Sequence, residues 1–308
     1  VGVIQGIQDM GPTHINETMQ RTPGVWISRG NGQENLTAIR SPVLTGAGGC
    51  GAFLTAEDGI PLRASGFCNV NELFDANGEQ AERIEVIKGP QSTLFGKNAS
   101  AGVISVVTRP PQFEFGGSVE AVYGNFNTVV LKGDVTGPLT ENIAFSLDGN
   151  YQSRDGYANI VNLDEEQNNR DRWGVRGQLL VEPTSDFRIR AIVDYSEIDE
   201  VCCQVGSLVN GPTAAGIAAV GGQIADPADF FEYEAFLNFV PTNQVENYGG
   251  SIQMDWSTGP ISVTSITAYR ELRNFFLSDI DYTSADSATE TRDQAVDTFT
   301  QEIRIASD

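Results

Sequence analysis

Few side chains in this 308-residue sequence have the types and spacing needed for catalysis or metal binding. The single histidine, His14, has no G-x-S-x-G nucleophile elbow to act with, so no hydrolase triad is indicated. One histidine also removes most histidine-based metal sites. The segment Gly46-Ala-Gly-Gly-Cys-Gly51 satisfies the G-x-G-x-x-G spacing of dinucleotide sites, but a strand and turn are expected after it instead of the required helix. We therefore predict no enzyme, no catalytic residue, no metal site and no cofactor.

Charge and composition narrow the class of partner. Lys and Arg number 19 and Asp and Glu number 41, which gives a net charge of -22. Nucleic-acid binding requires a basic patch that neutralises phosphates, so we predict no nucleic-acid partner. Glycine accounts for 33 residues, and this enrichment favours a protein of strands and tight turns.

After Pro110-Pro111 the sequence becomes a series of segments in which apolar and polar residues alternate. In Ile143–Tyr151 the apolar residues fall on one face and the polar ones on the other. The other segments are Ser118–Gly124, Thr128–Thr136, Trp173–Val181, Phe187–Tyr195, Tyr248–Trp256, Ile261–Arg270 and Thr298–Ala306. The clearest segments alternate for about 9–11 residues, the length with which a tilted strand crosses a membrane. Strands of soluble proteins average about 5–6 residues.

Short and long connections alternate between these segments, as in membrane barrels. The short ones are Gly137–Asn142, Glu182–Asp186 and Ser257–Pro260, the long ones are Ser153–Asp171, Glu197–Glu246 and Leu272–Ala295, and the tight Gly124–Asn127 link is the exception. Aromatic residues mark the strand ends next to the long loops: Tyr123, Tyr151, Trp173, Tyr195, Tyr248 and Tyr269. Phe187 and Trp256 mark the opposite rim, so we expect two interfacial aromatic girdles.

A soluble β-sandwich also alternates along one face and is the competing interpretation. Strand length, the alternation of loop lengths, and the charges Arg188, Arg190 and Asp194 on one polar face favour the membrane barrel. The longest uncharged run, Val201–Ala225, holds Pro212 and several glycines, and we interpret it as a loop and not as a membrane-spanning helix.

The first 110 residues have a different, mixed character. Short strands are expected around Gly24–Ser28, Phe53–Glu57, Arg83–Lys88 and Gly102–Thr108, with a short helix over Thr13–Arg21. Gly89-Pro90 ends the third strand because proline cannot donate to a ladder. Gln91–Phe95 can form one helical turn, Gly96 and Asn98 can adopt left-handed conformations at its exit, and Gly102 permits close backbone approach.

The stretch ERIEVIKGPQSTLFGKNASAGVISVVT, from Glu82 to Thr108, resembles the plug-domain signature of TonB-dependent outer-membrane receptors. Ala52–Pro61, Pro23-Gly-Val, Arg29-Gly and Ile39-Arg are also similar to that plug. The resemblance implies a mixed α/β plug domain over residues 1–110, followed over residues 111–308 by antiparallel transmembrane β-barrel strands. About eight strands are expected here, of the roughly 22 in such barrels. We therefore expect a fragment of a longer receptor that lacks the signal peptide and the TonB-contacting segment.

The resemblance also implies roles for particular residues. The signature residues are expected to hold the plug together and seat it in the barrel: Arg83, Glu85, Lys88, Gly89, Pro90, Leu94, Phe95, Gly96, Asn98 and Gly102. As an alternative, the charged members Arg83, Glu85 and Lys88 face the barrel wall as a releasable polar latch. Apical plug loops are expected to face the substrate through Gly46, Gly48, Gly49, Gly66 and Phe67.

The four cysteines fall into two pairs. Cys50 and Cys68 flank the plug turn that contains Glu57-Asp-Gly-Ile-Pro61, and because the cell envelope permits disulfides we predict a bridge between them. Cys202 and Cys203 are neighbours, with Cα atoms about 3.8 Å apart, below the usual disulfide range of about 4.4–6.8 Å. Their pairing therefore stays open.

The family implies energised import of a scarce, bulky substrate across the bacterial outer membrane. The transported ligand is expected to be an Fe(III)–siderophore, and vitamin B12, haem and oligosaccharide importers share the same plug. The implied partners are TonB with its inner-membrane energising complex, a small-molecule or metal-chelate substrate, and outer-membrane lipid with lipopolysaccharide. A receptor-like surface-binding or signalling protein is the alternative.

Overall fold

A computed structural model describes residues 2–4, 17, 19–29, 35–39, 53–62, 81–96, 99–203 and 207–307. The N-terminal part of the chain forms a five-stranded sheet, here the small sheet, with strand order β1-β6-β7-β4-β5. Its elements are β1 (Gly2–Ile4), β4 (Phe53–Glu57), β5 (Ile60–Pro61), β6 (Ala81–Lys88) and β7 (Gly102–Thr108). A separate hairpin joins β2 (Val25–Arg29) to β3 (Asn35–Ile39), and α2 (Ser92–Phe95) lies between β6 and β7.

A two-residue turn connects β4 to β5 in the small sheet. Its residues Asp58 and Gly59 both have positive φ, +49° and +82°, and Glu57 pairs directly with Ile60. Asp-Gly is the sequence that type I′ hairpin turns favour, because both central residues must adopt left-handed conformations. The turn therefore holds Glu57 and Asp58 at the tip of the small sheet.

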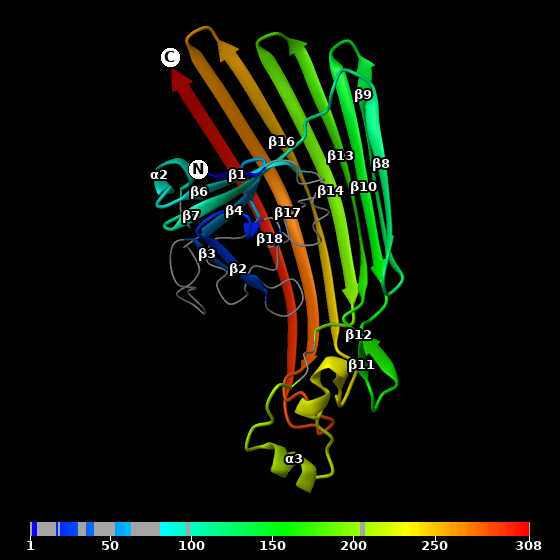
Figure 1. Ribbon diagram of the computed structural model, residues 1–308. Helices are drawn as coiled ribbons and strands as arrows, with labels where there is room; N and C mark the ends of the chain where they lie inside the picture. The colour runs from blue at the N-terminus through cyan, green and yellow to red at the C-terminus, as the bar shows by residue number, and fades with distance from the viewer. Residues whose placement is uncertain are drawn as a thin grey trace.

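The rest of the chain forms an eight-stranded sheet, here the large sheet, in which each strand pairs antiparallel with its neighbours along the chain (Figure 1). Its strands are β8 (Gly116–Gly124), β9 (Thr128–Thr140), β10 (Ile143–Arg154), β13 (Arg170–Thr184), β14 (Phe187–Glu200), β16 (Thr242–Thr258), β17 (Ile261–Asp279) and β18 (Thr289–Ser307). Short turns join the strands at one end, and long connections join them at the other, except for the short link between β8 and β9. All eight predicted strands are present, and together they form a curved wall.

The two faces of the large sheet differ in chemistry. We call the face that contacts the small sheet the inner face. The opposite, outer face exposes apolar side chains, among them Leu147, Val175, Leu179, Val193, Ile252 and Met254. On the inner face polar side chains are buried, including Arg172, Arg176, Gln178, Asp194, Asn247 and Arg270. Alternating residues point to opposite faces of a strand, so the predicted apolar outer face is confirmed.

Aromatic rings lie side by side on the outer face where the strands approach the long connections. The ring of Tyr195 lies 5.0 Å from that of Trp173 and 6.3 Å from that of Tyr248, measured between centroids. At the opposite end Phe187 and Trp256 are direct cross-strand partners. Aromatic residues of each predicted girdle are thus neighbours across adjacent strands.

The strands are longer than the alternation predicted. β16 has 17 residues and β17 and β18 have 19 each, so the expected loops Glu197–Glu246 and Leu272–Ala295 are wrong at their ends. Beyond the aromatic girdle the outer face carries charged residues such as Glu197, Glu246 and Glu271. The backbone ladder continues there, but the outward-facing residues are mostly polar, so the apolar outer face that marks a strand in the sequence ends at the girdle.

Two long connections carry secondary structure of their own. β11 (Ala158–Ile160), β12 (Glu165–Gln167) and β15 (Glu234–Ala235) form a three-stranded sheet in the order β12-β11-β15. The β14–β16 connection also holds α3 (Ala214–Ala219) and the 3-10 helix η3 (Pro227–Glu232). None of the helices in the described ranges is long and apolar enough to cross a membrane.

The small sheet packs against β16, β17 and β18 on the inner face (Figure 1). Its apolar core includes Ile84, Val86 and Ile104, and this core continues into wall residues Val245, Leu272 and Val296. In a second contact, Ile60 packs on Ile266 and Ala268 of β17. Burial of apolar surface thus joins two parts of the chain that are far apart in sequence.

Candidate functional site

Six residues lie in one transverse line on the inner face of the large sheet, and we call them the charged row. In strand order they are Asp134, Asp148, Arg176, Asp194, Gly249 and Arg270, and each is the direct cross-strand partner of the next. Directly opposed residues on one face are close enough for their side chains to interact. Strand register therefore brings five charged residues and one glycine, from six strands, to one level of the wall.

Two arginines of the charged row share one carboxylate. Arg270 donates to Asp194 through both terminal nitrogens, with N–O distances of 2.7 Å and 3.2 Å. Arg176 approaches the same carboxylate at 3.6 Å. All three side chains are buried, and Arg176 is only 2% exposed. Buried charges persist only when they are paired, so this arrangement depends on every member.

The small sheet adds the second carboxylate. Glu57, at the end of β4 and 3% exposed, forms an ion pair with Arg176. Glu57 and Asp194 together balance the charges of Arg176 and Arg270. This buried pair links the small sheet to the wall through charge.

Asp58, the next residue, makes a parallel set of contacts. Its carboxylate accepts from the Thr108 backbone N–H at 3.0 Å and from the Thr108 hydroxyl at 2.5 Å. Arg190 of the wall donates to the same hydroxyl at 2.7 Å and lies 3.5 Å from Asp58. Gln178 accepts from Arg190 at 3.0 Å and donates to the Arg109 carbonyl at 3.2 Å. The turn, the end of β7 and the wall thus form one polar network.

The signature charges proposed as a latch make their described ion pairs within the small sheet. Arg83 pairs with Glu85 at 2.6 Å and with Glu82 at 3.8 Å, and Lys88 donates to the Pro23 carbonyl. The hydrogen bond to Glu85 raises the pKa of Arg83. The ion pairs to the wall come instead from Glu57 and Asp58. The turn that contains Glu57 and Asp58 was singled out from the sequence, but their partners were not predicted. The arginines on the polar face of the wall strands could have indicated those partners.

The signature glycines are explained by backbone geometry. Gly89 has φ +104° and donates its N–H to the Ala101 carbonyl at 2.8 Å, and Gly96 has φ +73°. At Gly102 a Cβ would lie 2.8 Å from the Ile87 carbonyl oxygen and 2.9 Å from Ile39. The expected positive φ and close packing are therefore present.

The remaining signature residues lie at or beyond the same turn. Pro90 follows Gly89, and α2 exposes Leu94 while Phe95 packs with Leu54 and Val103. Several predicted residues lie outside the described residues: His14, Gly46, Gly48, Gly49, Cys50, Gly66, Phe67, Cys68 and Asn98. The predicted Cys50–Cys68 bridge and substrate-facing loops thus remain predictions. Cys202 and Cys203, which the sequence left open, are joined as a disulfide just after β14.

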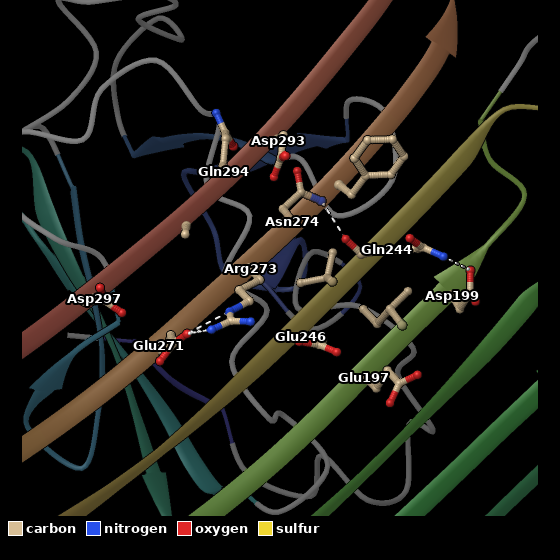
Figure 2. A pocket seen from close by; sticks show the side chains of 14 residues that line it. Glu197, Asp199, Gln244, Glu246, Glu271, Arg273, Asn274, Asp293, Gln294 and Asp297 are labelled. Carbon is tan, nitrogen blue, oxygen red and sulfur yellow. Dashed lines mark hydrogen bonds and ion pairs between the residues drawn. The ribbon is translucent and has the colours of Figure 1, made fainter.

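A hollow of about 580 Å³ lies where β14, β16, β17 and β18 approach the long connections (Figure 2). Six carboxylates line it, from Glu197, Asp199, Glu246, Glu271, Asp293 and Asp297. Arg273 pairs with Glu271 at 2.6 Å, and Gln244 donates to Asp199 at 3.2 Å. These side chains share the outer face with Tyr195, Tyr248 and Tyr269, so the hollow faces away from the small sheet. Across the described ranges no three acidic, histidine or cysteine side chains are grouped to hold a metal ion.

The connections at the long-loop end of the wall, including the short β8–β9 link, hold aromatic and polar groups. Tyr157 lies 5.8 Å from Tyr233 and 6.2 Å from Phe126 between ring centroids, and the Arg154 guanidinium lies 5.3 Å above the Tyr157 ring. The side chains of Phe126 and Tyr233 are about half exposed. A second hollow, of about 650 Å³, lies between the α3 segment and the β17–β18 connection.

Long strands with an apolar outer face, aromatic girdles and a small sheet seated on a polar inner wall define a membrane β-barrel protein with an internal plug. Sequence comparison agrees, since residues 4–103 match the family described as TonB-dependent Receptor Plug Domain. The ferrioxamine receptor of Yersinia enterocolitica is 31% identical over 145 residues, which are 47% of this chain and 20% of that receptor. The ferripyoverdine receptor of Pseudomonas aeruginosa is 31% identical over 139 residues, 44% of this chain and 16% of that receptor.

Solved structures show the same fold. The ferric yersiniabactin uptake receptor FyuA from Yersinia pestis superposes with a TM-score of 0.79 at 15% identity, covering 99% of this chain and 45% of that one. FpvAI in its complex with pyocin S2 gives a TM-score of 0.74 at 17% identity, with 99% and 40% coverage. The chain therefore spans less than half the length of these receptors. The chain resembles the TonB-dependent siderophore receptors of the bacterial outer membrane. From here the small sheet with its hairpin is called the plug, and the large sheet the barrel wall.

Proposed function

We propose that the protein imports a ferric siderophore across the outer membrane in a TonB-dependent manner. The observation that carries the proposal is the buried ion pair between Glu57 of the plug and Arg176 of the wall. A plug held by ion pairs and hydrogen bonds can exchange these contacts for water when it is pulled. The ferrioxamine and ferripyoverdine receptors that match this chain support the substrate class.

In this proposal the plug blocks the barrel until it moves, and the charged row of the wall anchors it. We call the contact between Glu57 and this row the plug seat. The apolar contacts of Ile60 with Ile266 and Ala268 and the pair Glu57–Arg176 keep the plug against the wall at rest. TonB, driven by its inner-membrane complex, supplies the force that separates them. Removing one partner of a buried ion pair typically costs about 3–5 kcal/mol, so the seat resists spontaneous opening.

The aromatic cluster at the long-loop end of the wall is suited to binding the substrate. Phe126, Tyr157 and Tyr233 present exposed rings, and Arg154 adds a positive charge beside them. Rings and a guanidinium together can contact a flat or anionic chelate through stacking and charge. The iron is cargo in this scheme, and the protein needs no resident cofactor. The aromatic girdle and the apolar outer face would contact outer-membrane lipid and lipopolysaccharide.

Uptake of radiolabelled iron tests the proposal. The full-length gene would be expressed in an outer-membrane receptor-deficient strain. The cells would be offered ferrioxamine, ferripyoverdine and a catecholate complex one at a time, with and without TonB, and in parallel haem and vitamin B12, each carrying its own radiolabel. We expect one ferric siderophore to be taken up only with TonB, while its binding to cells persists without TonB. Uptake that continues without TonB contradicts the energised mechanism, and uptake of haem or vitamin B12 alone contradicts the siderophore assignment.

A further inference from the structure

Gly249 occupies the one position of the charged row that has no side chain. Its cross-strand partners are Asp194 on β14 and Arg270 on β17, so it lies between two oppositely charged residues. Adjacent strands are about 4.8 Å apart, which separates the backbones of Asp194 and Arg270 by roughly 10 Å. Their side chains nevertheless meet at 2.7 Å and 3.2 Å. The arginine therefore reaches across β16 at the level of Gly249.

A side chain at position 249 is incompatible with this crossing. A Cβ there would lie 2.7 Å from the Tyr269 carbonyl oxygen, 3.0 Å from Arg270 Cγ and 3.2 Å from Arg270 Cα. Real Cβ atoms essentially never approach other atoms within 3.0 Å. Even alanine would therefore move the backbone of β16 or β17, and with it the stem of Arg270.

The reach of Arg270 across β16 determines which carboxylate pairs with which arginine. Asp194 receives two hydrogen bonds from Arg270, while Arg176 approaches it only at 3.6 Å. Arg176 thus remains available to Glu57 of the plug. Glu57 and Asp194 both approach the same Arg176 nitrogen, Nη2. Without the Arg270 bonds, the buried Asp194 would compete with Glu57 for that nitrogen.

We propose that Gly249 is a positioning residue for the plug seat: it lets Arg270 neutralise Asp194 across β16, which leaves Arg176 to hold Glu57. The structural claim stands on the wall geometry, and its meaning for transport rests on the proposed function. Arg270 acts at a distance from the plug, because its described hydrogen bonds in this network go to Asp194 and Asn247 of the wall.

Hydrogen–deuterium exchange of β4 and β7 in the full-length protein, in lipid and without TonB or substrate, measures how often the plug opens. We expect Gly249→Ala to raise the opening equilibrium by on the order of tenfold, within the range of coupled neighbours. Gly149→Ala is the matched control, because its Cβ would meet nothing closer than 3.7 Å. This exchange measurement needs neither iron nor uptake. The inference about Gly249 can therefore fail while the import proposal stands, and the import proposal can fail while the inference about Gly249 stands.

A double-mutant cycle separates positioning from general damage. In a Glu57→Gln background the effect of Gly249→Ala should largely vanish, since Arg176 then has no plug carboxylate to hold. In an Asp58→Asn background the effect should persist, because Asp58 uses Arg190 instead. Equal effects of Gly249→Ala with and without Glu57, or an effect no larger than that of Gly149→Ala, would overturn the proposal.

Arg270→Met keeps the test decisive if Gly249→Ala does not assemble in the membrane. This substitution removes the bonds to Asp194 without placing an atom at position 249. It should also increase opening of β4, and this increase should also depend on Glu57. An Arg270→Met effect that is independent of Glu57 contradicts the inference.

Discussion

The outer and inner faces of the barrel wall are built from alternate residues of the same strands, yet they follow different rules. Outer residues such as Leu147, Leu179 and Ile252 share only apolarity, because lipid accepts any apolar side chain. Inner residues such as Arg176 and Asp194 are specified individually, because each buried charge needs a partner at a defined distance. One strand can therefore tolerate wide substitution on its outer face and much less at the buried charges of its inner face.

The largest effect is expected where the inner face loses a charge. Arg176→Met leaves Glu57 without its described ion-pair partner and removes the second cation near Asp194. We expect plug docking to lose about 3–5 kcal/mol, measured as urea-dependent exposure of the plug to protease. Arg188→Met is the control on the same face, because its pair with Asp255 is half exposed and is worth at most about 1 kcal/mol. Equal effects of the two substitutions would contradict the distinction.

The next effect tests the rule of the outer face. Leu179 lies on β13 between the girdle residue Trp173 and the turn at its far end. Leu179→Arg should cost about 2–4 kcal/mol in reversible folding into lipid vesicles, because a charge near the membrane midplane is desolvated. Leu179→Met should cost less than about 1.5 kcal/mol. If Leu179→Arg folds as well as Leu179→Met does, the outer face does not contact lipid.

A smaller effect extends the comparison into the plug. Gly102→Val places atoms against the Ile87 carbonyl and the Ile39 side chain, and should destabilise the plug by about 1–3 kcal/mol. Gly116→Val is the matched control, since a Cβ at that position meets nothing within 4 Å. The two variants are compared by thermal unfolding of the plug, which is detected as sensitivity to protease. A control variant as unstable as Gly102→Val would show that crowding is not the cause.

The smallest effect concerns the β17–β18 connection, outside both faces. Burial alone would raise the pKa of Asp281, but hydrogen bonds from Thr283, Ser287 and Ala288 outweigh it and hold this pKa below the ordinary 3.8. A carboxylate with a depressed folded-state pKa stabilises its loop above the ordinary pKa, and this contribution is lost as the pH falls through the folded value. The loop should therefore stay ordered at neutral pH and loosen only in strong acid.

The backbone amide resonance of Ala288 reports this titration by nuclear magnetic resonance. It should shift at a pH below 3.8, and Asp281→Asn should abolish the shift. Asp286→Asn is the control, because Asp286 accepts its described hydrogen bond from Asn238 and not from this amide. A midpoint above the ordinary value contradicts the hydrogen-bond explanation.

Several features followed from local rules and were predictable. Strands β4 and β7 agree with the predicted ranges at both ends, because Gly and Pro punctuate the chain around them. The ends of β14, β16, β17 and β18 that face the long connections were missed. The outward-facing residues there are mostly charged, so the sequence pattern stops although the backbone hydrogen bonds between the strands continue. The short β11, β12 and β15 were missed for a related reason: strands of two or three residues depend on partners distant in sequence.

The apolar face of each strand can be read from the sequence alone, because side chains alternate with a period of two whatever surrounds them. The positions at which glycine and proline end the elements can be read in the same way. Which charges meet depends on the folded wall. Arg270 and Asp194 are 76 positions apart, and strand register brings them to one level while the missing side chain of Gly249 lets them touch. Pairing across strands depends on register, which accumulates over several turns and loops, so no local pattern encodes it.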